Sequence, residues 1–350
     1  MTRRTLLSAA LASVPAVLSR GSAAAATEPN LSLGAAPTGF GIHLRAAREA
    51  HQPADLIDLC HQLGLGGVET RLPAEDAAAV RAFRRKLDAY GMRVILNTAL
   101  PRDAADVERF DASVKACKEA GAYSLHAAMT QRRYEEFDTF AAFKAKFEQC
   151  QKQLELAEPV LRKNRMRLGI ENHKGWRSAE QAAWMRRVDS EWVGVHLDFG
   201  NNISLCEVPA ETLENLAPYA VACHLKDMAV QNYQDGFLLS EVPLGEGVLD
   251  LPLWVRTLRA RHPEIVFDLE TITRNPLQIP VFTKKYWATF DDSYSPLPGR
   301  DLAQVLEIVR ENPPKSPLPH VTGLSLPEQA RLEDENNRKS IEYARANLRL

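Results

Sequence analysis

The chain has 350 residues, of which 45% are hydrophobic and 25% are charged, which is ordinary for a globular protein and enough for one large domain or two. Its formal net charge of −2 does not indicate a nucleic-acid-binding protein. The five cysteines have no CxxC spacing, and their odd number predicts no disulfide framework. We interpret Cys60, Cys117 and Cys223 as small core residues, because they lie in segments of apolar periodicity.

Residues 1–26 have the pattern of an export signal. Arg3 and Arg4 precede an apolar run that reaches about Ser19, and small residues follow up to Ala26. This pattern predicts a twin-arginine signal peptide and an exported, periplasmic protein; a Sec signal and a plain N-terminal helix are the alternatives. The apolar run is shorter than the about 20 residues of a membrane span, so we expect no stable membrane insertion. Removal of the three arginines in this segment changes the formal charge from −2 to −5, which again argues against nucleic acid as a partner.

After a polar lead-in at residues 27–37, short apolar runs alternate with segments of helical periodicity. The runs begin near residues 39, 66, 93, 123, 167, 193, 221 and 265. The first run, residues 40–44, is predicted to be a strand, and the segment 134–164 is predicted to hold an insertion or a long helix. Eight such units predict an α/β fold, a (β/α)8 TIM barrel over residues 27–274. A doubly wound sheet is the alternative, but it would gather its site at one switch point.

Four of the later runs each end in a side chain that can bind a metal. Glu171 follows an apolar run, Asp198 ends the next run, and His224 and Glu270 end the two after that. In a parallel barrel the carboxyl ends of the strands meet at one face, where ligand sites lie. Three carboxylates and one imidazole suit a hard ion such as Mn²⁺ or Mg²⁺ better than zinc.

Residues 275–350 lie outside this repeat. Proline and aromatic residues are frequent in residues 275–299, four prolines occur in residues 313–319, and residues 326–350 are predicted to form a charged helix. We interpret this part as a C-terminal extension wrapped on the barrel. It either borders the site or forms a contact in a homo-oligomer.

The motifs around these strand ends resemble the xylose-isomerase-like barrels, a group that includes sugar isomerases, ketose 3-epimerases, inosose dehydratase and endonuclease IV. The resemblance covers roughly residues 38–272 and rests on IENHKG (170–175), RSAE (177–180), GVHLDFGNN (194–202), CHLKD (223–227) and FDLET (267–271). It implies one divalent metal, usually manganese or magnesium, bound by Glu171, Asp198, His224 and Glu270. It also implies that Glu171 and Glu270 act as the acid and base on opposite faces of the substrate.

Other polar or aromatic residues are weaker candidates for binding a carbohydrate substrate, and each has an alternative interpretation. His173 faces the same way as Glu171, while His196 either orients a ligand or is a core histidine. Asn201 and Lys226 follow ligands and are candidates for binding sugar hydroxyls; Lys226 is alternatively a solvated charge or a partner of Asp227. The remaining candidates, each with packing or simple exposure as the alternative role, are His126, Asn97, Trp176 and His43.

The predicted function is a metal-dependent sugar isomerase or epimerase that transfers a proton next to a carbonyl through an enediolate. Ketose 3-epimerases carry a histidine where this chain has Asn201 and an arginine near the position of Val230, so the substrate stays open. The alternative is a lyase or dehydratase of a keto-sugar, inosose or 3-keto-glycoside, and a further one is a non-catalytic sugar-binding barrel. A hydrolase like endonuclease IV is disfavoured by the acidic charge.

Overall fold

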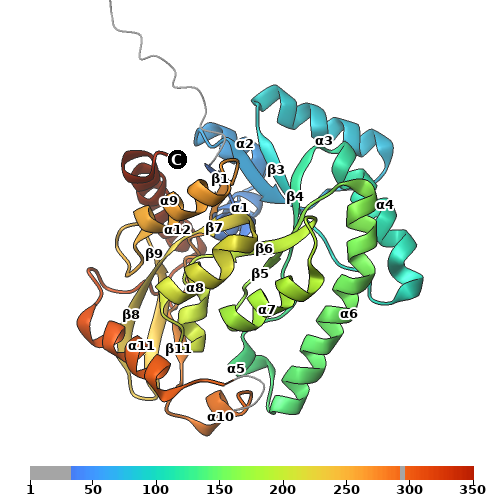
Figure 1. Cartoon of the computed structure of the whole chain (residues 1–350). Coiled ribbons are helices and arrows are strands. Elements are labelled where there is room, and N and C mark those ends of the chain that lie inside the picture. Colours follow the sequence, from blue (N-terminus) through green and yellow to red (C-terminus); the bar gives the residue numbers. More distant parts are fainter. Residues whose placement is uncertain (1–32, 292–295) are drawn as a thin grey trace, which may run out of the picture.

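The computed structural model describes residues 33–291 and 296–350, and its centre is a closed barrel of eight parallel strands (Figure 1). Neighbouring strands around the barrel follow the chain order, and β10 pairs with β1 to close the ring. The strands are β1 Leu33–Ala35, β2 Gly67–Thr70, β3 Arg93–Asn97, β4 Ala122–Ala127, β5 Leu168–Glu171, β6 Val193–Asp198, β7 Ala220–Leu225 and β10 Phe267–Leu269. The prediction of a TIM barrel is confirmed. The predicted signal segment, residues 1–26, lies outside the described residues.

Helices between the strands cover the outside of the barrel. They are α2 Leu56–Gln62, α3 Ala77–Tyr90, α4 Val107–Glu119, α6 Phe140–Asn164, α7 Ser178–Val188, α8 Pro209–Leu216 and α9 Leu251–Arg261. Local signals set several boundaries: Asp55 and Asp76 accept backbone N–H bonds at the starts of α2 and α3, and Gly91 takes a left-handed conformation where α3 ends. The segment 134–164 is mostly the long helix α6, preceded by the short α5 Arg133–Glu136.

The predicted first strand is wrong. Residues 40–44 end a 3-10 turn, Pro37–Phe40, and begin helix α1 Gly41–Glu49, while the strand lies earlier, at Leu33–Ala35. This strand has only three residues, and a Cβ at Gly34 would lie 2.1 Å from an oxygen of Asp268. The close approach requires glycine, so the strand lacks the β-branched run by which strands are recognised.

A small antiparallel sheet beside the barrel was not predicted. It consists of β8 Asp227–Tyr233, β9 Gly236–Val242 and β11 Leu277–Ile279, in the order β11-β9-β8. The hairpin β8–β9 directly follows β7, and β11 comes from the beginning of the C-terminal extension. The sheet therefore ties the extension to the barrel on the side of β7.

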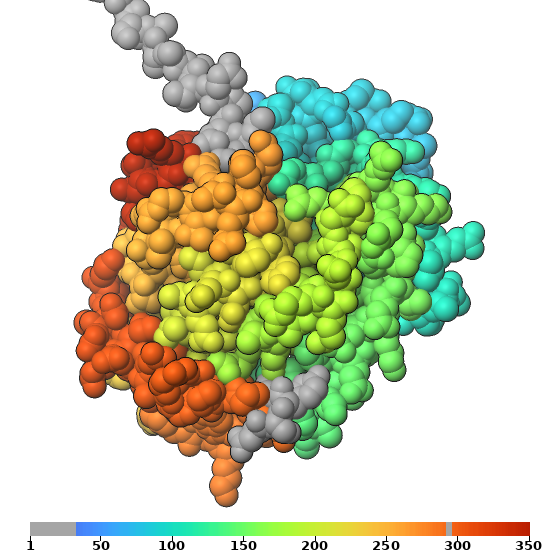
Figure 2. All heavy atoms as spheres, viewed as in Figure 1, coloured from blue at the N-terminus to red at the C-terminus, as the bar shows by residue number. Residues whose placement is uncertain are grey.

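The rest of the extension consists of α10 Lys284–Trp287, α11 Gly299–Glu311 and α12 Leu326–Tyr343, which a π-helical turn, Ala344–Leu348, continues. In Figure 2 its orange and red atoms lie along the left side and the lower edge of the face shown. Helix α12 packs on α1, where the Glu333 carboxylate accepts the backbone N–H groups of Ile42 and His43 at 3.1 and 2.7 Å. Among the described residues, no helix has the length and apolar character needed to cross a membrane.

Candidate functional site

The four predicted metal ligands meet at the carboxyl ends of their strands. Glu171 and Asp198 are the last residues of β5 and β6, His224 lies in β7, and Glu270 follows β10. Asp198 is in register with His224, and His224 with Asp268, so the side chains converge on one face. All four are buried, with at most 6% of the residue surface exposed. We call these four residues the mouth.

Distances within the mouth are short enough for one ion. One ligand atom each of Glu171, Asp198 and His224 lies within 4.8 Å of the other two, and Glu270 Oε2 is 3.6 Å from His224 Nδ1. Asp198 Oδ1 and His224 Nδ1 are buried without a hydrogen-bond partner among the described residues. Buried polar atoms are nearly always paired, so these two unpaired atoms fit a divalent cation.

Lys226 places an ammonium group against the mouth. Its Nζ lies 2.8 Å from Asp198 Oδ2 and 2.9 Å from Glu270 Oε2, and Glu241 Oε1 of β9 is 3.8 Å away. Burial alone would lower the pKa of Lys226, but these carboxylates raise it well above its ordinary value. The predicted pairing with Asp227 is wrong, because Asp227 instead accepts backbone N–H bonds from the turn after β9.

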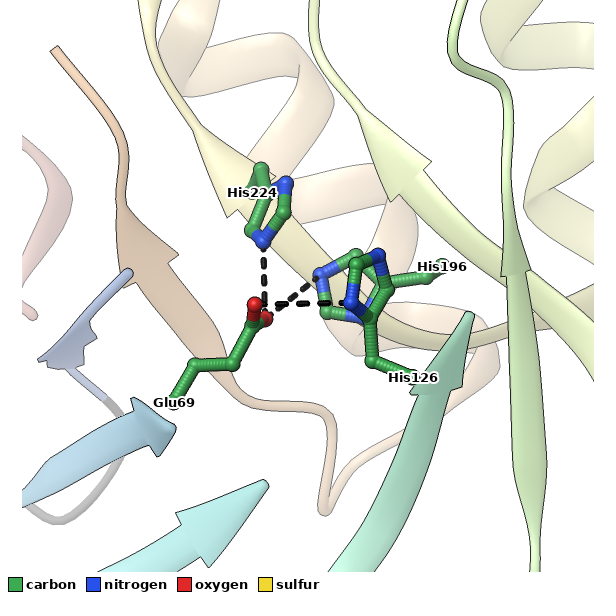
Figure 3. Close-up of side chains that lie close together, drawn as sticks. All are labelled: Glu69, His126, His196 and His224. Carbon is green, nitrogen blue, oxygen red and sulfur yellow. Dashed lines mark hydrogen bonds and ion pairs between the residues drawn. The ribbon is translucent and has the colours of Figure 1, made fainter. Parts of the chain in front are cut away.

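A second layer, deeper in the barrel, surrounds Glu69 of β2 and includes His126, His196 and His224 (Figure 3). We call Glu69, His126 and His196 the inner layer. Glu69 Oε2 lies 2.8 Å from His224 Nε2, and Glu69 Oε1 lies 3.4 Å from His126 Nδ1. If His224 donates its Nε2–H to Glu69, the Nδ1 atom that faces the mouth is free to bind a metal. Glu69 is therefore placed to hold this tautomer of His224.

His126 links the inner layer to the mouth. Its Nε2 lies 3.1 Å from Glu171 Oε2, and its Nδ1 lies 2.6 Å from Asn97 Oδ1. Burial lowers the pKa of His126, but the carboxylates of Glu69 and Glu171 outweigh it and the pKa is raised. The interpretation of Asn97 and His126 as residues near the site agrees with these contacts.

His196 packs between the other two histidines, with ring centroids 4.5 Å from His126 and 4.2 Å from His224. Neither ring nitrogen has a hydrogen-bond partner among the described residues, and burial lowers its pKa well below the ordinary value. The four residues around Glu69 could in principle hold an ion. We assign them an orienting role, because nitrogens of His126 and His224 already contact Glu69, Asn97 and Glu171.

Polar side chains after β5 and β6 complete the site. His173 Nδ1 lies 2.8 Å from the Thr130 carbonyl, so Nδ1 carries the proton and Nε2 is left as an acceptor. Asn201 donates to Asp198 Oδ2 and accepts from the ammonium of Lys174. Asn201 therefore contacts the mouth through Asp198, and His173 lies near enough to Glu171 to lower the pKa of that carboxyl. Their roles in substrate binding stay predictions.

Two weaker candidates lie elsewhere. Trp176 is fully buried and packs on Trp184 and Phe147, with centroids 5.3 and 5.5 Å away, so its ring is not available to stack on a sugar. His43 lies on α1 and pairs with Asp334 of α12 at 2.8 Å, which is a packing contact between helices. Both predictions of a role in substrate binding are corrected.

Sequence reasoning missed several residues around the mouth. Glu69 could have been suspected, because a carboxylate in the short apolar strand β2 needs a partner. Thr38 donates to Glu270 Oε1 at 2.5 Å, and Glu241 pairs with Arg274 at 2.7 Å. Thr38 and Glu241 carry no local signal, since their partners lie 232 and 33 residues away in sequence. Lys174 stands within the IENHKG motif but was not singled out.

Comparisons with known proteins give two curated relatives. A curated relative, the uncharacterized protein YihM of Escherichia coli strain K12, is 23% identical over 217 residues, 61% of this chain and 64% of that protein. A 3-oxo-isoapionate decarboxylase of Pectobacterium atrosepticum is 30% identical over 109 residues, 31% of this chain and 40% of that protein. The chain thus spans less than two thirds of the length of either relative.

Solved structures share the fold at low sequence identity. A D-psicose 3-epimerase has a TM-score of 0.54 at 13% identity, covering 90% of this chain and 98% of that one. A xylose isomerase-like barrel from Mycobacterium smegmatis in complex with magnesium has a TM-score of 0.50 at 15% identity, covering 81% and 97%. The family model of the xylose isomerase-like TIM barrel matches residues 57–288. The chain belongs to the xylose isomerase-like TIM barrel family.

Proposed function

We propose that this protein is a divalent-metal-dependent isomerase or epimerase that moves a proton next to the carbonyl group of a sugar or sugar derivative. The observation that carries the proposal is the convergence of the four mouth residues, with Asp198 Oδ1 and His224 Nδ1 buried and unpaired among the described residues. Structural neighbours named as epimerases support the same class of reaction. Export by the twin-arginine route stays a prediction from residues 1–26.

The donor set of the mouth supports Mg²⁺ or Mn²⁺ as the ion. Glu171, Asp198, Glu270 and the Nδ1 atom of His224 offer three carboxylates and one imidazole, which oxygen-preferring ions favour. When bound, such an ion would polarise the substrate carbonyl and stabilise the negative charge that develops on its oxygen. A neighbour of the same fold was solved with magnesium, which supports this choice.

Glu171 is the proposed base. Burial raises its pKa, but the nearby imidazoles of His173 and His126 outweigh burial and hold the pKa well below the ordinary value. An ionised Glu171 takes the proton from the carbon beside the carbonyl, and the electron pair of the broken C–H bond moves onto the carbonyl oxygen. His126, at 3.1 Å, keeps the carboxylate oriented.

Glu270 is the proposed partner on the other side of the substrate. Strands β7 and β6 separate β10 from β5 in the barrel, so Glu270 and Glu171 approach the mouth from different sides. Thr38 and Lys226 fix the Glu270 carboxylate at 2.5 and 2.9 Å. Glu270 takes up a proton from solvent. Its delivery to the opposite face of the same carbon gives epimerisation, and its delivery to the neighbouring carbon, with transfer of the hydroxyl proton to the former carbonyl oxygen, gives isomerisation.

The second candidate function is a lyase or dehydratase that uses the same carbanion. Two observations favour keeping it: Asn201 stands where ketose 3-epimerases carry a histidine, and a curated relative is a decarboxylase. In this reaction the Lys226 ammonium beside Glu270 would protonate the departing hydroxyl group. The two functions share their first proton transfer. They differ because the lyase or dehydratase then expels a hydroxyl group or aglycone, whereas the isomerase or epimerase keeps the skeleton intact.

Proton-to-deuterium exchange followed by NMR tests the proposal. The manganese-loaded protein is incubated in D₂O with ketoses, inososes and 3-keto-glycosides. Deuterium at a carbon beside the carbonyl, with the skeleton intact, is the expected result for an isomerase or epimerase. Deuterium uptake with loss of a hydroxyl or aglycone would assign the lyase instead, and the absence of exchange with every compound would contradict both.

A further inference from the structure

Lys174 is a buried lysine beside the mouth that the proposed reaction does not use. It lies in the loop after β5, is 2% exposed, and has a left-handed backbone conformation with φ of 43°. Its carbonyl accepts the backbone N–H of Arg133 at 3.1 Å, and a Cβ on the next residue, Gly175, would lie 1.9 Å from Thr130 Oγ1. The loop is therefore closely packed in a conformation that costs about 1 kcal/mol for a residue other than glycine.

The positive charge of the buried Lys174 ammonium group has few partners. Among the described residues its Nζ donates to one neutral acceptor, Asn201 Oδ1, and no carboxylate lies within 4.0 Å. Lys226, by contrast, has three carboxylates within that distance. Burial and the nearby Lys226 ammonium lower the pKa of Lys174 to about 8, so it is still mainly charged at pH 7. A buried ammonium without a carboxylate in contact with it costs several kcal/mol, and the packing of the loop gives no reason to keep it.

Two further cations, Lys226 and Arg274, lie near Lys174. Burial raises the pKa of Glu241, but the charges of Arg274, Lys226 and Lys174 outweigh burial and lower it. Lys226 pairs with Asp198 and Glu270 at 2.8 and 2.9 Å, and Arg274 pairs with Glu241, so Lys174 is the cation of the three that has no carboxylate in contact among the described residues. A negative group on the substrate would supply the missing charge.

We propose that Lys174 binds a carboxylate of the substrate, so that the sugar derivative on which this site acts is a sugar acid. This inference rests on the proposed function of the same mouth. A phosphate would provide the same kind of charge, but its two negative charges call for more donors than one ammonium with two N–H groups that have no acceptor among the described residues, because the nearby Arg274 is already paired with Glu241 at 2.7 and 3.2 Å.

Matched pairs of substrates test the inference. D-fructuronate and D-fructose differ only in a carboxylate in place of a terminal CH₂OH, and D-tagaturonate and D-tagatose form a second pair. We expect the manganese-loaded full-length protein to exchange deuterium into at least one acid roughly 10–100-fold faster, as kcat/KM, than into its neutral partner. Equal rates for both members of each pair would overturn the inference while leaving the proposed function standing. Faster exchange into D-fructose 6-phosphate than into the acids would overturn the carboxylate assignment.

Variants of Lys174 separate recognition from a structural role. In Lys174→Met the ratio between acid and neutral substrate should fall to near one, and Lys174→Arg should restore part of it. The melting temperature of Lys174→Met should stay equal or rise, because an uncompensated buried charge is removed; a structural lysine would give a fall. Lys152→Met, which changes an exposed lysine of α6, is the control and should keep the wild-type ratio.

Binding measurements keep the inference testable if none of these compounds is turned over. Calorimetric titration of the manganese-loaded protein should show D-fructuronate binding roughly 10–100-fold more tightly than D-fructose, with the difference lost in Lys174→Met. If no compound exchanges deuterium but D-fructuronate still binds more tightly than D-fructose, only the proposed function is contradicted. A difference in binding that survives Lys174→Met would contradict the role of Lys174.

Discussion

Acidic side chains are buried both in the mouth and beside the turn after β9, but their hydrogen-bond partners differ. At the start of β8, the two oxygens of Asp227 accept four backbone N–H groups at 2.9–3.2 Å, that of Met228 and, after β9, those of Gly245, Gly247 and Leu249. In the mouth, Asp198 Oδ1 and His224 Nδ1 have no hydrogen-bond partner among the described residues. Burial of a carboxylate therefore does not mark a functional site in this protein. Several ligand atoms that converge, two of them buried without a hydrogen-bond partner, mark it instead.

The largest effect is expected in the mouth. Glu171→Gln and Glu270→Gln should each lower proton exchange by a factor of roughly 10²–10⁴, because each removes one of the two groups that carry the proton. Far-UV circular dichroism and the melting temperature should show that the fold is kept. Glu270→Gln with wild-type exchange would exclude the mechanism with two glutamates.

Substitution of Asp227, which anchors the turn after β9, is expected to change the stability of the protein. Asp227→Ala leaves four buried N–H groups without an acceptor and should lower the free energy of unfolding by about 2–4 kcal/mol. Asp227→Asn keeps one side-chain oxygen as an acceptor and should cost less. Denaturant titration measures both variants. A loss of stability below about 0.5 kcal/mol in Asp227→Ala would contradict the anchoring role of this residue.

The inner layer should act on the mouth without touching substrate. Glu69→Gln weakens the hydrogen bond that fixes the tautomer of His224 and should lower metal affinity roughly 10–100-fold. Calorimetric titration with Mn²⁺ measures this change. Glu119→Gln, at an exposed position at the end of α4, is the matched control and should bind Mn²⁺ like the wild type. An unchanged affinity of Glu69→Gln for Mn²⁺ would contradict the role of Glu69 in orienting His224 as a metal ligand.

A smaller, pH-dependent effect is expected at Glu207, a buried carboxylate outside the mouth whose oxygens accept bonds from Ser178. Burial raises its pKa from 4.5 to about 7. Because the pKa is raised in the folded state, the stability from this group is complete below pH 4.5 and is lost as the pH rises through 7. The Glu207→Gln variant should lack this loss, which we expect to be on the order of 1 kcal/mol after relaxation around the charge. If the free energy of unfolding changes with pH in the same way in the wild type and in Glu207→Gln, the predicted contribution of Glu207 is contradicted.

Much of the barrel could be predicted because its strands are short apolar runs bounded by glycine or polar residues. The first strand, Leu33–Ala35, could not, since Gly34 is required by a contact with Asp268, far away in sequence. The hairpin β8–β9 was missed because it directly follows β7, where the repeat predicts a helix. Its pairing with β11 depends on a segment that comes after the barrel repeat.

The ligands of the mouth could be predicted because each follows its own strand, which is a local pattern. Their supports could not, because they depend on pairs of residues far apart in the chain. Glu69 and His224 are 155 residues apart, and Thr38 and Glu270 are 232 apart. Trp176 was misplaced because a loop position does not show that the ring packs on Phe147 of α6.

Metal content is the most direct test of the central claim that the mouth binds one divalent ion. The protein, Asp198→Ala and His224→Ala are each loaded with Mn²⁺, passed through a desalting column and analysed by inductively coupled plasma mass spectrometry. We expect about one Mn²⁺ per chain in the wild type and a large loss in both variants, with the fold retained by circular dichroism. Full metal content in both folded variants, or none in the wild type, would contradict the account.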